Sequence, residues 1–164
     1  ALVGSSLGGF VAYHLAVRQA RARDARVPVR SPVDRLVLLA PALDFGRSGF
    51  GPLGAIDLGQ WRGTDRHDVM HYARNQIVPI RFALYEDARK YDSFAEPLRT
   101  PMLIFHGRRD DVVDPAMVRR FANVRPAVSL RMLDDDHLLG ASLEVIWAES
   151  ARFLGVCHMG RETV

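Results

Sequence analysis

The chain of 164 residues is 48% hydrophobic, carries a formal net charge of +3 and has a sequence pI of about 9.5. Lys90 is its one lysine, and the arginines are scattered among apolar and acidic residues, so we expect no nucleic-acid binding. No apolar run is long enough to span a membrane and no signal-peptide pattern is present, so we expect a cytoplasmic protein that does not bind membranes. A single cysteine, Cys157, excludes an intrachain disulfide.

The first part of the chain alternates short apolar runs with a helical pattern. Residues 1–4 resemble the end of a strand, and the spacing of apolar residues predicts a helix over 7–23. The apolar run 35–42 predicts a buried strand that ends at Pro41. A long insert, 44–99, follows: we expect a glycine-rich loop over 44–61 and a helix over 78–91. Such an insert at the carboxyl edge of a sheet is where a cap over a substrate would lie.

The second part of the chain continues this alternation. The sequence predicts a strand over 100–107, a helix over 115–123, a strand over 128–133 and a helix over 142–154. Near-continuous apolar strands that alternate with helices are typical of a parallel sheet covered on both faces. We therefore predict a three-layer α/β fold with about four parallel strands, in one domain over 1–154, followed by a C-terminal tail over 155–164.

The stretch Gly4-Ser5-Ser6-Leu7-Gly8 matches the pattern G-x-S-x-G. It lies between a predicted strand and a predicted helix, which is the context of the nucleophile elbow, a sharp turn that exposes a serine hydroxyl above the sheet. We expect Gly4 and Gly8 to flank a turn too tight for side chains. The alternative is a structural glycine turn without chemistry. The context favours Ser6 as a nucleophile.

A serine nucleophile needs a base, and the base needs a carboxylate that orients it, in the chain order Ser, Asp or Glu, His. Asp110, Asp111 and Asp114 follow the predicted strand 100–107. We favour Asp110, with Asp111 next, because Asp114 precedes a proline and resembles a helix N-cap. His137 follows the last predicted strand and is the candidate base. His106, at the end of its strand, is expected to support the Asp110 turn.

Other ionisable residues fit catalysis less well. Asp134, Asp135 and Asp136 are consecutive and resemble a metal site, but one histidine and no repeated D-x-D loop lead us to expect no metal. The remaining histidines lie in a predicted helix, in the insert or in the tail: His14, His67, His71 and His158. We therefore expect a catalytic site that uses no metal ion.

Four segments together resemble the α/β-hydrolase superfamily and, more narrowly, small esterases of the YqiA/YcfP-like group: "GSSLGG", "LLAPALDF", "LIFHGRRDDVVDP" and "LDDDHLLGASLEVIW". The resemblance covers essentially the whole chain to about residue 154. It implies a cofactor-free hydrolase of small-molecule carboxylic esters, with Ser6 as nucleophile, Asp110 as acid and His137 as base. The backbone N–H of Leu7 would be one oxyanion-hole donor.

The resemblance also implies that strands normally precede the elbow, and that a loop after an early strand supplies the second oxyanion donor. We therefore expect the chain to correspond to the carboxyl two-thirds of a hydrolase, as a fragment or a truncated product. With the same triad, a thioesterase or a serine peptidase is an alternative. A catalytically silent domain that binds a partner is an alternative from another class.

Five aromatic residues in the insert would set the choice among substrates if they reach the site: Phe50, Trp61, Tyr72, Phe82 and Tyr85. Aromatic residues in such a cap more often form its own core, and we expect that role here. The sequence does not specify which residues bind the substrate, which acyl chain is cleaved, or the oligomeric state.

Overall fold

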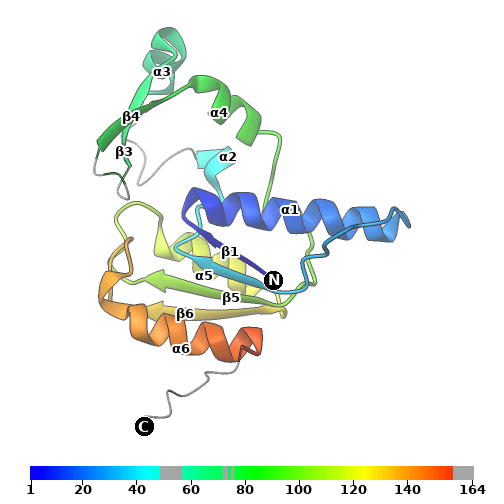
Figure 1. The fold of residues 1–164 in the computed structure, drawn as a ribbon. Helices are drawn as coiled ribbons and strands as arrows, with labels where there is room; N and C mark the ends of the chain where they lie inside the picture. Colours follow the sequence, from blue (N-terminus) through cyan, green and yellow to red (C-terminus); the bar gives the residue numbers. More distant parts are fainter. Residues whose placement is uncertain (49–56, 72–73, 75, 157–164) are drawn as a thin grey trace.

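The computed structural model describes residues 1–48, 57–71, 74 and 76–156 (Figure 1). Its centre is a parallel sheet with the strand order β1-β2-β5-β6. The strands are β1 (Leu2–Ser5), β2 (Leu36–Leu39), β5 (Met102–Gly107) and β6 (Val128–Leu133). Leu2 pairs with Leu36, Leu36 with Met102, and Met102 with Val128, so the first residues of the four strands are in register across the sheet. The predicted fold of about four parallel strands is confirmed.

Helices cover both faces of this sheet (Figure 1). Helices α1 (Leu7–Asp24) and α5 (Pro115–Asn123) lie on one face, and α6 (Leu143–Leu154) lies on the other. Side chains of a strand alternate between faces, and β2 shows this directly. Leu36 and Leu38 pack in the cluster under α1 and α5, whereas Val37 packs in the cluster under α6. Burial of both faces explains why the two central strands, β2 and β5, are apolar along nearly their whole length.

The ends of the later helices follow local sequence rules. The Asp114 carboxylate accepts a hydrogen bond from the N–H of Ala116 at 2.8 Å, so Asp114 is the N-cap of α5, as its position before a proline suggests. A 3₁₀ turn, Gly140–Ser142, precedes α6, and Gly155 ends that helix at a φ of 71°. These caps set the helices at nearly the predicted ranges.

The insert between β2 and β5 differs from the sequence prediction. It contains α2 (Phe45–Ser48), α3 (Leu58–Thr64), the antiparallel hairpin β3 (His67–His71) and β4 (Gln76–Ile80), and α4 (Phe82–Ala88). The helix predicted over 78–91 is therefore wrong at its start, since residues 76–80 pair with β3. The loop predicted over 44–61 is wrong at α2 and at the start of α3, where Asp57 caps the helix by accepting from Gly59 and Gln60.

The parallel strands place the functional segments together. The loops after β1, β5 and β6 all leave the sheet at its carboxyl edge, where ligands of α/β proteins bind. In Figure 1, α2 and α4 lie on the side of α1 away from the sheet, and the hairpin lies beyond them. Within the described ranges, no helix has the length and apolar character that crossing a membrane requires.

Candidate active site

Ser6 lies at the turn between β1 and α1, with a φ of 51° and a ψ of −120°. A positive φ at a residue other than glycine is strained, and such strain costs roughly 1–3 kcal/mol and clusters at functional sites. The neighbouring loop holds the turn in place. Ser6 N–H donates to the carbonyl of Leu39 at 2.8 Å, and Ala42 N–H donates to the carbonyl of Ser6 at 3.1 Å. The chain therefore turns sharply at Ser6, between the end of β1 and the first residue of α1.

The two glycines of the motif have different roles. A Cβ on Gly4 would lie 2.8 Å from the carbonyl carbon of Gly8 and 2.9 Å from the Cα of Gly9, so the turn requires a glycine there. A Cβ on Gly8 would meet no atom within 4 Å. The prediction that Gly8 avoids a collision is therefore wrong, because the first turn of α1 carries this residue on an open side.

Asp110 lies in the turn after β5, and its side chain is fully buried. Its Oδ1 accepts hydrogen bonds from the N–H of Val112 at 2.9 Å and of Val113 at 2.8 Å, which fix the carboxylate plane. Burial alone would raise the pKa of Asp110, but hydrogen bonds from His137, Val113 and Val112 outweigh it and lower the pKa below its usual range. Asp110 is therefore a negative charge held inside the protein.

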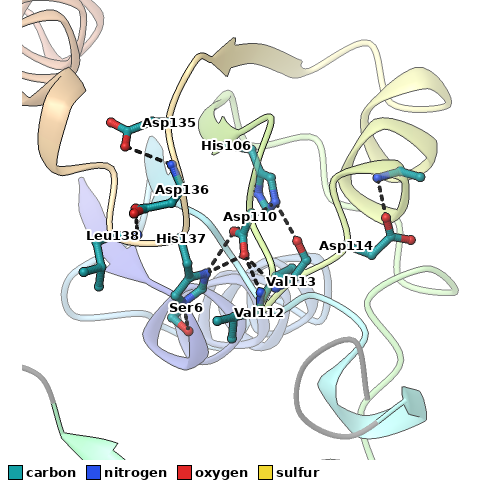
Figure 2. Close-up of polar contacts among 11 residues, drawn as sticks. Ser6, His106, Asp110, Val112, Val113, Asp114, Asp135, Asp136, His137 and Leu138 are labelled. Carbon is teal, nitrogen blue, oxygen red and sulfur yellow. Dashed lines mark hydrogen bonds and ion pairs between the residues drawn. The ribbon is translucent and has the colours of Figure 1, made fainter. Parts of the chain in front are cut away.

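His137 bridges Asp110 and Ser6 (Figure 2). Its Nδ1 lies 2.9 Å from Asp110 Oδ2 and 3.1 Å from Oδ1, and its Nε2 lies 3.0 Å from Ser6 Oγ. An ionised carboxylate only accepts hydrogen bonds, so Nδ1 carries the ring proton and its N–H donates a hydrogen bond to Asp110. Nε2 of the neutral ring then accepts a hydrogen bond from the Ser6 hydroxyl. Ser6, which lies 131 positions before His137 in the chain, thus joins His137 and Asp110 in one hydrogen-bonded series.

Backbone contacts hold the loop of Asp110 and the loop of His137 together. Arg108 N–H donates to the carbonyl of Leu133 at 2.8 Å, and Arg109 N–H donates to the carbonyl of Asp135 at 3.0 Å. Gly107 allows this approach, because a Cβ there would lie 2.5 Å from the carbonyl oxygen of Asp135 and 2.8 Å from the carbonyl carbon of Asp136. The position of His137 relative to Asp110 therefore depends on the end of β5 as well as on its own loop.

His106 lies behind Asp110 and is fully buried. Its Nε2 is 3.0 Å from the carbonyl of Val113 and 3.2 Å from Asp110 Oδ2 (Figure 2). A carbonyl only accepts, so Nε2 carries the proton, and Nδ1 is a buried atom with no partner among the described residues. Burial lowers the pKa of His106, although the Val113 carbonyl and Asp110 oppose the shift. The neutral ring supports the Asp110 turn, in agreement with the sequence interpretation.

The backbone N–H of Leu7 follows the Ser6 turn at the start of α1. It donates to no acceptor among the described residues, because the first bonds of the helix run from Gly9 and Phe10 to the Ser6 carbonyl. A free N–H at a helix N-terminus favours negative charge nearby. This group is therefore free to donate a hydrogen bond to an anion that lies beside Ser6.

The other carboxylates considered from the sequence lie elsewhere. Asp111 is exposed, and no hydrogen bond or ion pair of its side chain occurs in the described part of the chain. Asp134 pairs with Arg109, and the carboxylates of Asp135 and Asp136 accept from the backbone N–H of Asp136 and Leu138 respectively. Across the described ranges, no three His, Cys, Asp or Glu side chains lie close enough together to hold a metal ion.

The remaining histidines and the insert aromatics are not drawn into this network. His14 Nε2 lies 2.9 Å from Ser93 Oγ, and His67 packs beside Trp61 with ring centroids 5.4 Å apart. Trp61, Phe82 and Tyr85 form a small core of the insert, as expected. Nothing is described for the side chain of His71, and Phe50, Tyr72, Cys157 and His158 lie outside the described residues.

One contributor to the site was not found from the sequence. Ala42 holds the Ser6 turn through its backbone N–H, and an interaction of the backbone leaves no trace in residue type. Ala42 lies at the end of the predicted strand 35–42, and the apolar pattern of that run does not indicate this contact. The proline at position 41 is the one local signal that the chain turns there.

Comparison with protein families gives a match over residues 1–151 to UPF0227, described as an uncharacterised protein family. A bovine (Bos taurus) protein, the mitochondrial palmitoyl-protein thioesterase ABHD10, is 27% identical over 115 residues. That alignment covers 68% of this chain and 34% of the bovine protein.

Solved structures share the fold. A candidate hydrolase from Agrobacterium vitis S4 superposes with a TM-score of 0.73 at 26% identity, over 95% of this chain and 60% of that chain. Mouse α/β hydrolase domain-containing protein 10 superposes with a TM-score of 0.62 at 21% identity, over 95% of this chain and 62% of that chain. The chain thus has the α/β-hydrolase fold and spans less than two thirds of the length of these relatives.

Proposed function

The chain belongs to the UPF0227 family and has the α/β-hydrolase fold, and we propose that it is a serine hydrolase that cleaves carboxylic esters. In this proposal Ser6 is the nucleophile, His137 the general base and acid, and Asp110 the carboxylate that orients the imidazole. The substrate is a small-molecule ester. Every group that the reaction needs, apart from water, belongs to a protein side chain or backbone.

The first half of the reaction acylates Ser6. Ser6 Oγ attacks the ester carbonyl carbon while its proton passes to His137 Nε2, and Asp110 stabilises the imidazolium through the Nδ1 hydrogen bond. The carbonyl oxygen becomes an oxyanion and accepts a hydrogen bond from Leu7 N–H. The bond from the carbonyl carbon to the alkoxy oxygen then breaks, and the leaving alcohol takes the proton from Nε2.

The second half regenerates the enzyme. A water molecule donates its proton to His137 Nε2 and attacks the acyl carbon. The second tetrahedral intermediate collapses, the bond to Ser6 Oγ breaks, and Oγ takes back the proton from Nε2. The products are a carboxylic acid and the restored Ser6 hydroxyl, so each proton taken by the imidazole is returned within the same half-reaction.

One observation carries the proposal: a buried, ionised carboxylate connects through an imidazole to a serine hydroxyl that stands on a strained turn. A structural turn would relax the unfavourable φ of Ser6 by carrying glycine or asparagine at that position. A buried carboxylate that served only the fold would not need a second histidine in line with a hydroxyl. A silent binding domain gives no reason for either feature.

A thioester is the second candidate substrate class. The bovine relative is named a palmitoyl-protein thioesterase, and its 27% identity covers 68% of this chain. The same attack of Ser6 on a carbonyl carbon would release a thiol in place of an alcohol, with no change in the roles of His137 and Asp110. The two substrate classes are distinguished by comparing the hydrolysis rates of an oxygen ester and of the thioester with the same acyl group.

The test is the turnover of p-nitrophenyl esters, measured for three proteins: the unaltered chain, Ser6→Ala and Ser5→Ala. Ser5 is the matched control because it is the neighbouring, exposed serine at the end of β1. We expect turnover by the unaltered chain and by Ser5→Ala, and none by Ser6→Ala. Equal turnover by Ser6→Ala, or no turnover by the folded, unaltered chain, would contradict the proposal and favour the silent domain.

A further inference from the structure

An apolar groove begins beside the proposed nucleophile and runs along the outer side of α1. Its volume is about 290 Å³, and the residues of α1 that line it recur at helical spacing from Leu7 to Arg18. Leu7 lines one end of the groove and directly follows Ser6 in the chain, so this end lies one residue from the proposed nucleophile. The opposite wall comes from the insert, through Leu84 of α4 and Tyr91 beyond it. Figure 1 shows α4 lying on this side of α1.

The groove gathers apolar side chains that the fold leaves in water. Val11 is 59% exposed, Leu15 40%, Leu84 37% and Tyr91 42%, and all four line this one groove. Exposed apolar side chains gathered along one groove mark a binding surface more often than scattered ones do. His14, which also lines the groove, is already hydrogen-bonded, since its Nε2 lies 2.9 Å from Ser93 Oγ. The groove therefore favours an uncharged, aliphatic ligand.

Charged residues limit the length of such a ligand. Arg18 and Asp87 both line the groove. Among the lining residues of α1, Arg18 is the one farthest along the helix from Leu7. Eleven residues of helix separate Leu7 from Arg18, which corresponds to about 16 Å at the rise of an α-helix. An extended chain of carbon–carbon bonds advances roughly 1.25 Å per atom, so about twelve carbons fill the apolar length.

We propose that this groove binds the acyl chain of the substrate, and that the enzyme prefers acyl groups of about eight to twelve carbons. The inference rests on the proposed function, because it assigns the acyl half of the same ester. The continuity of the groove with the elbow is the reason to choose an acyl chain over a partner helix. When Ser6 holds the acyl carbon, the chain leads past Leu7 into the groove.

The spacing along α1 provides a molecular ruler. Val11 lies about 6 Å along the helix from Leu7 and Leu15 about 12 Å, so a tryptophan at either position blocks the groove at a different depth. Val11→Trp is expected to admit butanoate and exclude octanoate and dodecanoate. Leu15→Trp is expected to admit butanoate and octanoate and exclude dodecanoate. Val145→Trp is the matched control, since Val145 is 47% exposed on α6, on the opposite face of the sheet.

The test measures kcat/KM of the full chain with p-nitrophenyl butanoate, octanoate and dodecanoate. We expect the unaltered chain to prefer octanoate over butanoate by about tenfold, because added methylene groups are buried. Each tryptophan variant should lose about tenfold or more on the excluded esters and remain within about twofold on the admitted ones. The control should match the unaltered chain. A flat chain-length profile, or equal losses on all three esters, would overturn the inference.

A binding measurement separates this inference from the proposed function. Calorimetry with the sodium salts of the three fatty acids, on proteins that also carry Ser6→Ala, requires no catalysis. The same pattern of admitted and excluded chains supports the groove even if no ester is turned over, a result that would contradict the proposed function alone. Affinity that does not depend on chain length or on the two tryptophans would overturn the inference while leaving the proposed function intact.

Discussion

Replacement of Asp110 by asparagine tests the orientation of the base. The asparagine oxygen can keep the two bonds that Oδ1 accepts from Val112 and Val113. The amide nitrogen then takes the place of Oδ2, 2.9 Å from His137 Nδ1. An amide N–H is a donor, so it favours the ring tautomer whose Nδ1 is bare. Nε2 then carries the proton and cannot accept the one that Ser6 must give up.

The expected magnitude follows from this change of tautomer. In a Ser-His-Asp triad the wrong tautomer lowers kcat by about 10⁴, which corresponds to about 5.5 kcal/mol of transition-state stabilisation. The fold should lose much less. Asp110→Asn removes the charge-assisted hydrogen bond to His137, and a hydrogen bond of this kind contributes about 1.5–3 kcal/mol. The loss of activity should therefore far exceed any loss of folded protein.

The assay is the rate at which a fluorophosphonate probe labels the protein, with the free energy of unfolding measured by urea titration on the same sample. Asp111→Asn is the matched control, because Asp111 is the exposed neighbour of the fully buried Asp110. We expect the control to react at the unaltered rate. If folded Asp110→Asn protein were labelled within tenfold of the unaltered rate, Asp110 would not orient the base and the reasoning would be refuted.

Two further predictions concern stability. Gly4→Ala should lower the free energy of unfolding by about 1–3 kcal/mol, because its Cβ meets backbone atoms, whereas Gly8→Ala should raise it by up to about 1 kcal/mol; equal urea midpoints would contradict this. Burial lowers the pKa of His106 and of His14, so the folded state should lose stability as the pH falls from about 6.5 towards their lower folded-state pKa values, where the unfolded chain binds more protons. His106→Gln cannot titrate and should show a shallower loss between about pH 7 and 5.5 than the unaltered chain, and an unchanged slope would argue against it. Asp110, whose pKa is lowered below 3.8, should add its own loss only at more acidic pH.

The sheet and its helices could be predicted because burial on two faces imposes a clear pattern. Residues 128–133 and 115–123 were predicted at their observed bounds, since an apolar run and a capped amphipathic helix both leave strong periodic signals. Chain order and the polarity of a parallel sheet also predicted that Ser6, Asp110 and His137 would lie at one edge. The distances among them depend on loop geometry, which residue type alone does not determine.

The insert could be predicted less well for a physical reason. Residues 76–80 contain apolar residues at 77, 78 and 80, a spacing that suits one turn of helix as well as a short strand. The pairing of this segment with 67–71 decides for the strand, and that pairing is an interaction between segments. The start of α3 had a local signal, the N-cap Asp57, which the surrounding glycines obscured.

Detection of a covalent intermediate on Ser6 is the most direct test of whether Ser6 is the nucleophile. The protein is mixed with p-nitrophenyl acetate, and the reaction is stopped with acid within the first turnover. The protein is then digested, and the masses of its peptides are measured by mass spectrometry. We expect an acetyl group on Ser6 and none on the same peptide of Ser6→Ala. Release of p-nitrophenol with no acetyl group on Ser6, or with the acetyl group on Ser5, would contradict it.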